Sequence, residues 1–171
     1  ILQQLGGAYA NPGNRNNEIG LPLAVLAAPD DARFAVYEMG AGKPGDIAYL
    51  TAIARPDVAL VNNIAPAHLE RMGSLQGVAE TKGAIHDALP ADGVAVVNAD
   101  DGFAAYFIGR LHDRRVLRFG IDADADVTAR EIRIDAHGSR FVLVSPQGDT
   151  EVRLPMPGRH NVANALAAAS M

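Results

Sequence analysis

The sequence predicts an α/β fold, namely a doubly wound, mostly parallel sheet followed by a small antiparallel β meander. Three observations predict it. Short strands rich in valine and alanine alternate with helices through the middle of the chain, and strands of this kind, buried on both faces and joined by helical crossovers, run parallel. Polar side chains collect where these strands end. After Asp126 apolar and polar residues alternate one by one, as in half-buried antiparallel strands.

The elements of the main layer follow in chain order. Residues Ile1 to Leu5, before Gly6-Gly7, read as the last turns of a helix that glycine ends. Four strands are expected, at Phe34 to Glu38, Asp57 to Asn62, Gly93 to Asn98 and Arg115 to Phe119. Three helices are expected between them, near Asp46 to Ala54, Leu75 to Leu89 and Phe103 to Leu111. Open α/β sheets bind ligands at the carboxyl ends of their strands, where this chain carries Glu38, Asn62, Asn63, Asn98 and Asp100.

The meander is expected within residues 126–155. Its strands are Val127 to Ile134, Ser139 to Ser145 and Thr150 to Leu154, and turns fall at His137-Gly138 and Gln147-Gly148. It carries no catalytic cluster, so we expect it to pack against the main sheet. A last helix, Asn161 to Met171, ends while still rich in alanine. We therefore expect residues 1–171 to form one domain that is incomplete at both ends.

Composition limits the partners and the chemistry. The chain has 171 residues, 49% of them hydrophobic, and a formal net charge of -5 without a cluster of lysine and arginine, which argues against nucleic acid and anionic membranes as partners. The absence of cysteine excludes disulfides and thiolate metal sites, so any metal is expected to be a hard cation. The first residues lack the features of a signal peptide. We expect a cytoplasmic monomer.

The most informative position is Lys82. In its helix, Leu75, Val78, Ile85 and Leu89 form an apolar stripe, and Lys82 occupies the missing place in that stripe. Burying an ammonium group is costly unless it is paired or chemically altered. One interpretation is that the stem of Lys82 covers apolar surface while its amine reaches water. In the other, the neutral amine reacts with carbon dioxide to give a carbamate, an anionic oxygen ligand suited to magnesium.

Two further residues are candidate metal ligands. Glu38 closes a strand and enters the turn Met39 to Gly42, which would present its carboxylate at the edge of the sheet. His68 lies in the loop after the next strand, and a neutral imidazole binds divalent cations. If the two strands are neighbours, both side chains project from the same edge. The alternatives are an acid that faces solvent and an ordinary polar loop residue.

Asparagines mark two more places. At the start of the last helix, His160, Asn161 and Asn164 would form a polar face at a helix N-terminus, which attracts anions. Asn161 acting simply as the helix cap is the alternative. Near the chain start, Asn14, Asn16 and Asn17 lie in a loop that suits recognition of a polar substrate, although turn formation accounts for some of them.

Four segments in this order carry a resemblance to a known family. They are GNRNNEIGLPL, YEMGAGKPGDIAYLT, RPDVALVNNIAPAHLERMGSLQGVAETKGAI and PGRHNVANALAAA. Together they span nearly the whole chain, and they resemble the central ATPase domain of the Mur ligases, which add amino acids to the peptidoglycan precursor. The double asparagine and the EMGA...GDI pattern are most similar to the branch that adds D-alanyl-D-alanine. The resemblance implies a fold like that of the P-loop NTPases.

The resemblance also implies substrates, cofactors and residue roles. The family joins an amine to a carboxylate with ATP, through an acyl phosphate, and the implied substrates are UDP-N-acetylmuramoyl-tripeptide and D-Ala-D-Ala. The implied roles are Glu38 on an Mg²⁺ that bridges the ATP phosphates, His68 and carbamoylated Lys82 on a second Mg²⁺, Lys82 and His160 in catalysis, Asn161 near the nucleotide, Asn164 facing adenine, and Asn14, Asn16 and Asn17 on the side of the UDP-linked peptide.

The sequence departs from the family pattern in several places. Gly42-Lys43 replace a polar pair, and Ala84 and His86 replace acidic and aromatic residues after the helix lysine. A glycine-rich phosphate loop, GxxGK[ST], does not occur among the 171 residues, so the chain alone is not expected to catalyse ligation. Two alternatives stay open: a non-catalytic binding module, and a sibling ligase that adds a diamino acid or glutamate or makes folylpolyglutamate.

Overall fold

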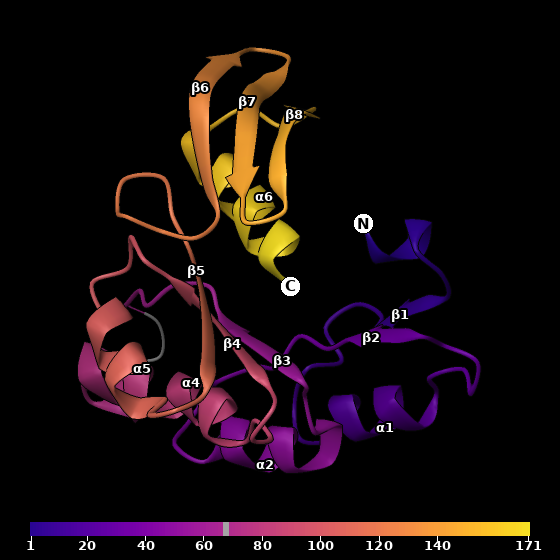
Figure 1. Cartoon of the computed structure of the whole chain (residues 1–171). Coiled ribbons are helices and arrows are strands. Elements are labelled where there is room, and N and C mark those ends of the chain that lie inside the picture. The colour runs from indigo at the N-terminus through magenta and orange to yellow at the C-terminus, as the bar shows by residue number, and fades with distance from the viewer. Residues whose placement is uncertain (67–68) are drawn as a thin grey trace. The chain divides into compact units, whose positions relative to one another are not determined.

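The chain forms two compact units in a computed structural model that describes residues 1–66 and 69–171 (Figure 1). The first unit comprises Ile1–Asp57 and Ile64–Pro90, and the second comprises Val58–Asn63 and Ala91–Met171. Each unit has its own apolar core, so each can be described by itself. None of the described helices is both long and apolar enough to cross a bilayer.

The first unit combines a two-stranded parallel sheet with helices. Its elements are the 3-10 helix η1 (Leu2–Gln4), β1 (Ala8–Ala10), α1 (Gly20–Leu26), β2 (Phe34–Val36), α2 (Asp46–Ala54), α3 (Leu69–Met72) and α4 (Leu75–Asp87). Strands β1 and β2 pair in parallel. Leu21 of α1 packs with Ile47 and Leu50 of α2, and Ala84 and Ile85 of α4 lie against this cluster.

Helix α1 and strand β1 were not predicted. The loop before α1 is rich in turn-forming residues, and this concealed the helix. In the structure, Oδ1 of Asn17 accepts hydrogen bonds from the N–H groups of Ile19 and Gly20 at 3.2 and 2.7 Å, which satisfies amides that a helix start leaves without partners. Pro22 falls in the first turn of α1, where a missing N–H is tolerated. Strand β1 has only three residues, too few for a periodic signal.

The second unit contains a parallel sheet, an antiparallel sheet and two helices. Its elements are β3 (Val58–Val61), β4 (Val94–Asn98), α5 (Ala104–Arg110), β5 (Arg115–Phe119), β6 (Thr128–Asp135), β7 (Gly138–Ser145), β8 (Gly148–Leu154) and α6 (Arg159–Ser170). The parallel sheet has the order β3-β4-β5. Leu60, Val96 and Leu117 are register partners in it, and all three belong to the cluster of apolar residues that includes Leu166 of α6.

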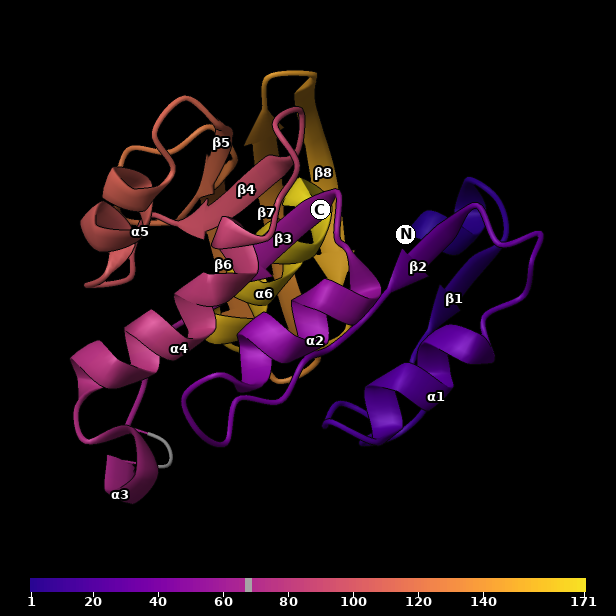
Figure 2. The same cartoon turned by 90° about the horizontal axis from the view of Figure 1, so that it is seen from below.

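Helix α6 contacts both sheets of the second unit (Figures 1 and 2). Val162 and Leu166 of α6 are fully buried, together with Val96 and Phe119 of the parallel sheet and Phe141 of β7. The meander therefore packs on α6 and shares one apolar core with the parallel sheet, which agrees with the expectation that it packs against the main sheet. The part that α6 takes in this core was not predicted. One face of the strand β7 is apolar, and the apolar side of α6 covers that face.

The predicted fold class is confirmed, with one correction. Parallel strands joined by helices and a three-stranded antiparallel meander are both present. However, the parallel strands form two sheets among the described residues, because β2 pairs with β1 while β3 pairs with β4. The neighbouring strands assumed for Glu38 and His68 are therefore not observed. That residues 1–171 form one incomplete domain stays a prediction.

Candidate functional site

The backbone of Glu38 is fixed by the loop that follows β1. Its N–H donates to Oδ1 of Asn11 at 2.9 Å, and Nδ2 of Asn11 donates to the carbonyl oxygen of Glu38 at 3.2 Å. This pair of bonds mimics a strand pairing just beyond the end of β2. The asparagine-rich segment thus continues the sheet by side-chain contacts.

The side chain of Glu38 is exposed, and a hydrogen bond orients it. Nδ2 of Asn16 donates to its Oε1 at 2.8 Å, and the carbonyl oxygen of Asn16 accepts from the N–H of Gly40 at 2.7 Å. An oriented, solvent-accessible carboxylate offers the hard oxygen donor that Mg²⁺ prefers when it also binds phosphates. The donor chemistry of Glu38 therefore fits the metal that the family implies.

The other two loop asparagines differ in what they do. The side chain of Asn17 accepts from the amides at the start of α1, whereas the side chain of Asn14 is exposed. Asn16 and Asn17 both line a cleft of about 750 Å³ in the first unit. A substrate-binding role for Asn14, Asn16 and Asn17 stays a prediction.

Sequence reasoning missed much of this cleft. Besides the asparagines it is lined by the turn Gly40 to Asp46, by Tyr49 of α2 and by Arg71 of α3. Tyr49 is 52% exposed, so a large aromatic ring lies open to solvent on a helix whose Ile47 and Leu50 are buried. In the sequence, the aromatic Tyr49 between the apolar residues Ile47 and Leu50 could have indicated an exposed binding residue on this helix. Helix α3, which carries Arg71, has only four residues, too few for a pattern that the sequence could show.

The turn in the cleft is organised by Asp46. Its Oδ2 accepts from the N–H groups of Gly42 and Lys43 at 3.0 and 2.9 Å. Asp46 also opens α2, where a negative charge is favourable. The cleft is also lined by Glu18 and by Lys43 and Arg71, and the two cationic groups suit an anionic ligand.

Lys82 lies on α4 and is half-buried. Val78 and Leu89 of its stripe are 0% and 3% exposed, but Leu75 at the helix start is 39% exposed, so the fully buried stripe expected from the sequence is shorter than predicted. Half-burial is compatible with both interpretations of Lys82. His68, the third expected metal ligand, lies outside the described residues. Among the residues the structure describes, no cluster of three or more His, Asp or Glu side chains is present.

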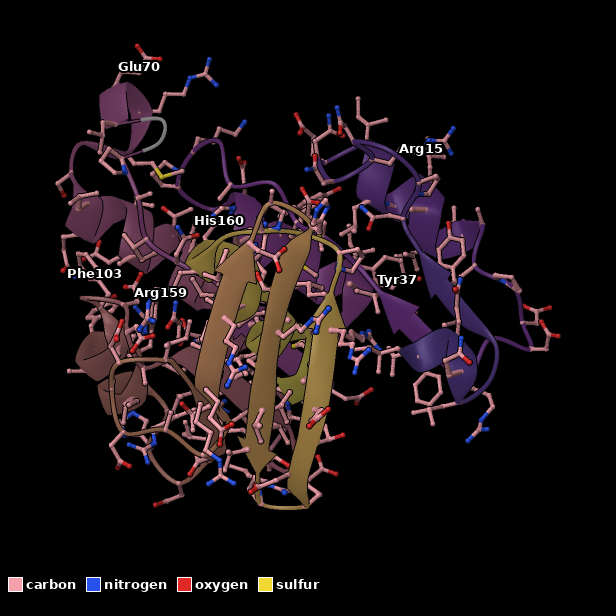
Figure 3. The ribbon with its side chains drawn as sticks, turned by 90° about the horizontal axis from the view of Figure 1, so that it is seen from above. Arg15, Tyr37, Glu70, Phe103, Arg159 and His160 are labelled. Atoms are coloured by element: carbon pink, nitrogen blue, oxygen red, sulfur yellow. The ribbon has the colours of Figure 1, made fainter. Side chains whose placement is uncertain are left out.

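The second unit carries the other candidate residues. Helix α6 begins at Arg159, and its N-cap is Gly158, with φ of 111° and no side-chain cap. Asn161 does not cap the helix, since its Nδ2 donates to the carbonyl oxygen of Pro157 at 2.8 Å. His160 is exposed at the first turn, beside Arg159, which pairs with Asp122 (Figure 3).

Gly158 makes room for His160. A Cβ at position 158 would lie 2.6 Å from Cε1 of His160, and the φ of 111° is one that L side chains rarely adopt. The backbone at this position therefore favours glycine, and a larger residue would also displace the imidazole of His160. The helix N-terminus and the exposed imidazole together favour an anion.

Asn164 is one turn further along α6 and meets the end of the parallel sheet. Its Oδ1 accepts from Nδ2 of Asn62 at 3.1 Å. Nδ2 of Asn98 in turn donates to the carbonyl oxygen of Asn62 at 2.9 Å. Asn62 and Asn98 lie at the carboxyl ends of β3 and β4, the edge where open parallel sheets bind ligands.

The candidate residues therefore form two groups. Glu38 and Asn16 are brought together in the first unit, which also contains Lys82. Asn164 is brought to the sheet end in the second unit, which also contains His160 and Asn161.

Comparison with known proteins identifies the family. The Mur ligase middle domain matches residues 1–171. The UDP-N-acetylmuramoyl-tripeptide--D-alanyl-D-alanine ligase of Escherichia coli (strain K12) is 45% identical over 172 residues, which cover 100% of this chain and 38% of that protein. The ligase of the same name from Haemophilus influenzae is 43% identical over 93% of this chain and 34% of its own length. The chain thus spans a little over a third of these relatives.

Solved structures agree. A crystal structure of MurF from Acinetobacter baumannii superposes with a TM-score of 0.94 at 36% identity, covering 99% of this chain and 37% of that one. MurF of Thermotoga maritima, in complex with ADP, gives a TM-score of 0.85 at 30% identity, with 99% and 39% covered. The chain therefore belongs to the Mur ligase family, through the middle domain that all of its residues match.

Proposed function

We propose that the protein containing this chain is an ATP-dependent ligase that joins D-alanyl-D-alanine to UDP-N-acetylmuramoyl-tripeptide, as the relative MurF does. The observation that carries the proposal is the 45% identity, over the whole chain, to the E. coli enzyme of that name. The Mycobacterium tuberculosis enzyme of the same name is 39% identical over 100% of the chain. By contrast, structures of a diaminopimelate ligase and a folylpolyglutamate synthetase, at 24% and 22% identity, share the fold alone.

Nucleotide binding belongs to the second unit in this proposal. The complex of the T. maritima relative contains ADP. In this chain the first two turns of α6 carry His160, Asn161 and Asn164, and Asn164 bonds to Asn62 at the carboxyl end of β3. A helix N-terminus with exposed amides favours phosphate groups, and asparagine side chains suit a nucleobase because they both donate and accept. We infer that Asn164 faces the base and that His160 lies near the phosphates.

Metal binding belongs to Glu38, His68 and Lys82. Magnesium, when bound, would neutralise charge on the phosphates during phosphoryl transfer. Glu38 would hold one ion with the oriented carboxylate that Asn16 supports. His68 and Lys82, the latter as a carbamate, would hold a second ion. Lys82 is half-buried on α4 of the same unit as Glu38.

The reaction takes two steps. A carboxylate oxygen of the tripeptide attacks the γ-phosphorus of ATP, which breaks the bond to ADP and gives an acyl phosphate. The amine of D-Ala-D-Ala then attacks the acyl carbon, inorganic phosphate leaves, and the amine gives up its proton. The chain's own groups position these reactants. The cationic side chains of Lys43 and Arg71 in the first-unit cleft suit the carboxylates of the peptide substrate, and the imidazole of His160 suits the charge that develops on the transferred phosphate.

The test is phosphate release by the complete protein that contains this chain. With ATP, Mg²⁺ and UDP-N-acetylmuramoyl-tripeptide, release should depend on D-Ala-D-Ala and should not occur when glutamate or diaminopimelate replaces it. Release with only one of those two amines would assign the protein to a sibling ligase. No release with any amine, from protein that binds the UDP-linked substrate, would favour the non-catalytic module. A cytoplasmic location and a monomeric state stay predictions.

A further inference from the structure

Three asparagines form a relay of hydrogen bonds across the second unit. Oδ1 of Asn98 accepts from the N–H of Asp100 at 3.0 Å, and Nδ2 of Asn98 donates to the carbonyl oxygen of Asn62 at 2.9 Å. Nδ2 of Asn62 then donates to Oδ1 of Asn164 at 3.1 Å. The relay links the ends of β4 and β3 to helix α6, and its last member is the residue assigned above to the nucleobase.

The backbone brings these side chains to one face. Leu60, Val96 and Leu117 are register partners that point toward α6. Side chains of a strand alternate between the two faces, so Asn62 and Asn98, two residues beyond Leu60 and Val96, continue the row that faces α6. Asn164 lies two residues beyond the buried Val162 and two before the buried Leu166, at an exposed position of the same helix. The relay is thus built by sheet register and helix phase together.

The hydrogen bonds give each amide of the relay an orientation in the structure. Asn98 has a backbone N–H at its oxygen and a backbone carbonyl at its nitrogen, so its amide can lie in one way only, and it anchors the main chain at Asn62. From there the Asn62 amide donates to Asn164, and the carbonyl side of the Asn164 amide is engaged. The amide is planar, and its NH₂ group is therefore turned away from Asn62 with donors to offer. A purine ring presents nitrogen acceptors, which a donor of this kind recognises.

We propose that Asn62 is a positioning residue for nucleobase recognition: it holds the amide of Asn164 so that Asn164 donates to a ring nitrogen of adenine. The inference rests on the proposed function, because that function places the base at Asn164. It goes further in naming the group that orients Asn164 and the class of atom that Asn164 reads. Asn62 itself need not touch the nucleotide.

The first experiment measures the coupling of the two residues in the complete protein. Asn62→Ala and Asn164→Ala should each raise KM for ATP about three- to tenfold, the usual worth of one hydrogen bond, with kcat and KM for the UDP-linked substrate nearly unchanged. In the double variant the increase should equal that of Asn164→Ala alone, because Asn62 acts through Asn164. Two independent increases that multiply would overturn the proposal.

The second experiment reverses the amide. An aspartate at position 62 only accepts, so in Asn62→Asp the Asn164 amide should turn its NH₂ group toward position 62 and present its oxygen to the base. The variant is assayed with ATP and with purine riboside triphosphate, which keeps the ring nitrogens and lacks the exocyclic amine. The ratio of KM for the analogue to KM for ATP should rise at least about threefold over the unmodified protein, because the amine becomes the donor that Asn164 needs. An unchanged ratio contradicts the assigned orientation.

A structural role for Asn62 predicts a different pattern. If Asn62 only stabilises the sheet end, Asn62→Ala should lower Tm and kcat together and should do so equally in the Asn164→Ala background. Should Asn62→Ala fold poorly, Asn62→Asp supplies the same test of orientation. Failure of the proposed function is recognised separately, because an unmodified protein without amine-dependent phosphate release fails before any variant is compared.

Discussion

Lys82 is the residue whose chemistry the sequence marked most clearly, and the structure leaves it half-buried on α4. If its amine carries a carbamate that holds a metal, Lys82→Ala in the complete protein should lower kcat by about 10- to 100-fold, the scale seen when metal sites lose supporting groups. Added acetate should restore part of the activity by supplying carboxylate oxygens. Phosphate release assays with and without acetate provide the measurement.

A matched control separates rescue from a general salt effect. Lys43→Ala removes another lysine of the same unit, one that lines the cleft, and acetate should not restore whatever activity that variant loses. Near-normal activity of Lys82→Ala would reduce Lys82 to a residue whose stem covers apolar surface.

Asn16 should act through Glu38. Its amide donates to Oε1 of Glu38 at 2.8 Å, so Asn16→Ala frees the carboxylate to rotate and should raise the Mg²⁺ concentration for half-maximal activity by roughly 10-fold. Asn14→Ala is the matched variant, because Asn14 lies in the same loop without a bond to Glu38. A magnesium titration that moves equally in both variants would show that Asn16 does not orient a metal ligand.

Tyr37 gives a dependence on pH that belongs to the fold. Burial, and then the neighbouring Tyr9, whose ring centroid lies 6.1 Å away, raise the pKa of Tyr37 above its ordinary value of 10.0. Below pH 10 the phenol is neutral in both states. As the pH rises from 10 toward the folded pKa, the unfolded chain loses its proton first, so the stability falls with pH. Urea unfolding at about pH 9 and about pH 11 should show a smaller loss for Tyr37→Phe; an equal loss would mean that other groups cause it.

At the scale of elements, the meander contains a row of like charges that lowers its stability. Arg133, Arg140 and Arg153 are register partners on β6, β7 and β8, so three like charges lie side by side on the face away from Phe141 and α6. All three are exposed, and among the described residues none of them forms an ion pair, although Glu131 and Glu151 line the same surface. Like charges directly opposite each other on a sheet are destabilising.

Replacing the middle arginine should therefore stabilise the chain. Arg140→Thr removes two repulsions and introduces a good strand former, so the free energy of unfolding in urea should rise by about 0.2–1 kcal/mol at low salt. The gain should shrink at high salt, where charges are screened. Arg130→Thr is the control, because Arg130 pairs with Asp149 and its removal should bring no gain. Equal effects of the two substitutions would show that strand propensity alone decides.

Helices and strands were predictable where their hydrophobic pattern extended over enough residues to be recognised. Helix α2 was predicted at its observed bounds, Asp46–Ala54, and the three meander strands to within two residues. Helix α1 was missed because Pro22 and the asparagines before it are typical of loops, although Asn17, whose side chain accepts from the N–H of Gly20 three residues later, was a local sign of a helix start. Short β1 has a sheet partner distant in sequence, which no local pattern reveals.

At the scale of the whole molecule, residue types were predictable and their partners were not. The sequence indicated Glu38, Asn62, Asn98 and Asn164 as polar groups at strand and helix ends, and they are at those places. That Asn16 holds Glu38 and Asn62 holds Asn164 depends on contacts across 22 and 102 residues. Such pairings follow from sheet register and helix phase, which exist only after the chain has folded.

The 171 residues by themselves should bind ATP weakly. In the proposed function Asn164 faces the base, but the glycine-rich GxxGK[ST] segment does not occur in this sequence. The backbone amides and lysine of that segment cradle phosphates in P-loop proteins, and phosphate contacts supply much of the affinity for a nucleotide. Calorimetric titration of the isolated chain with ATP and Mg²⁺ should therefore give a Kd no tighter than about 1 mM, or about -4.1 kcal/mol. The complete protein, titrated in parallel, should bind far more tightly. Micromolar affinity of the isolated chain, lost in Asn164→Ala, would show instead that the start of α6 and the asparagine relay hold the nucleotide without such a loop.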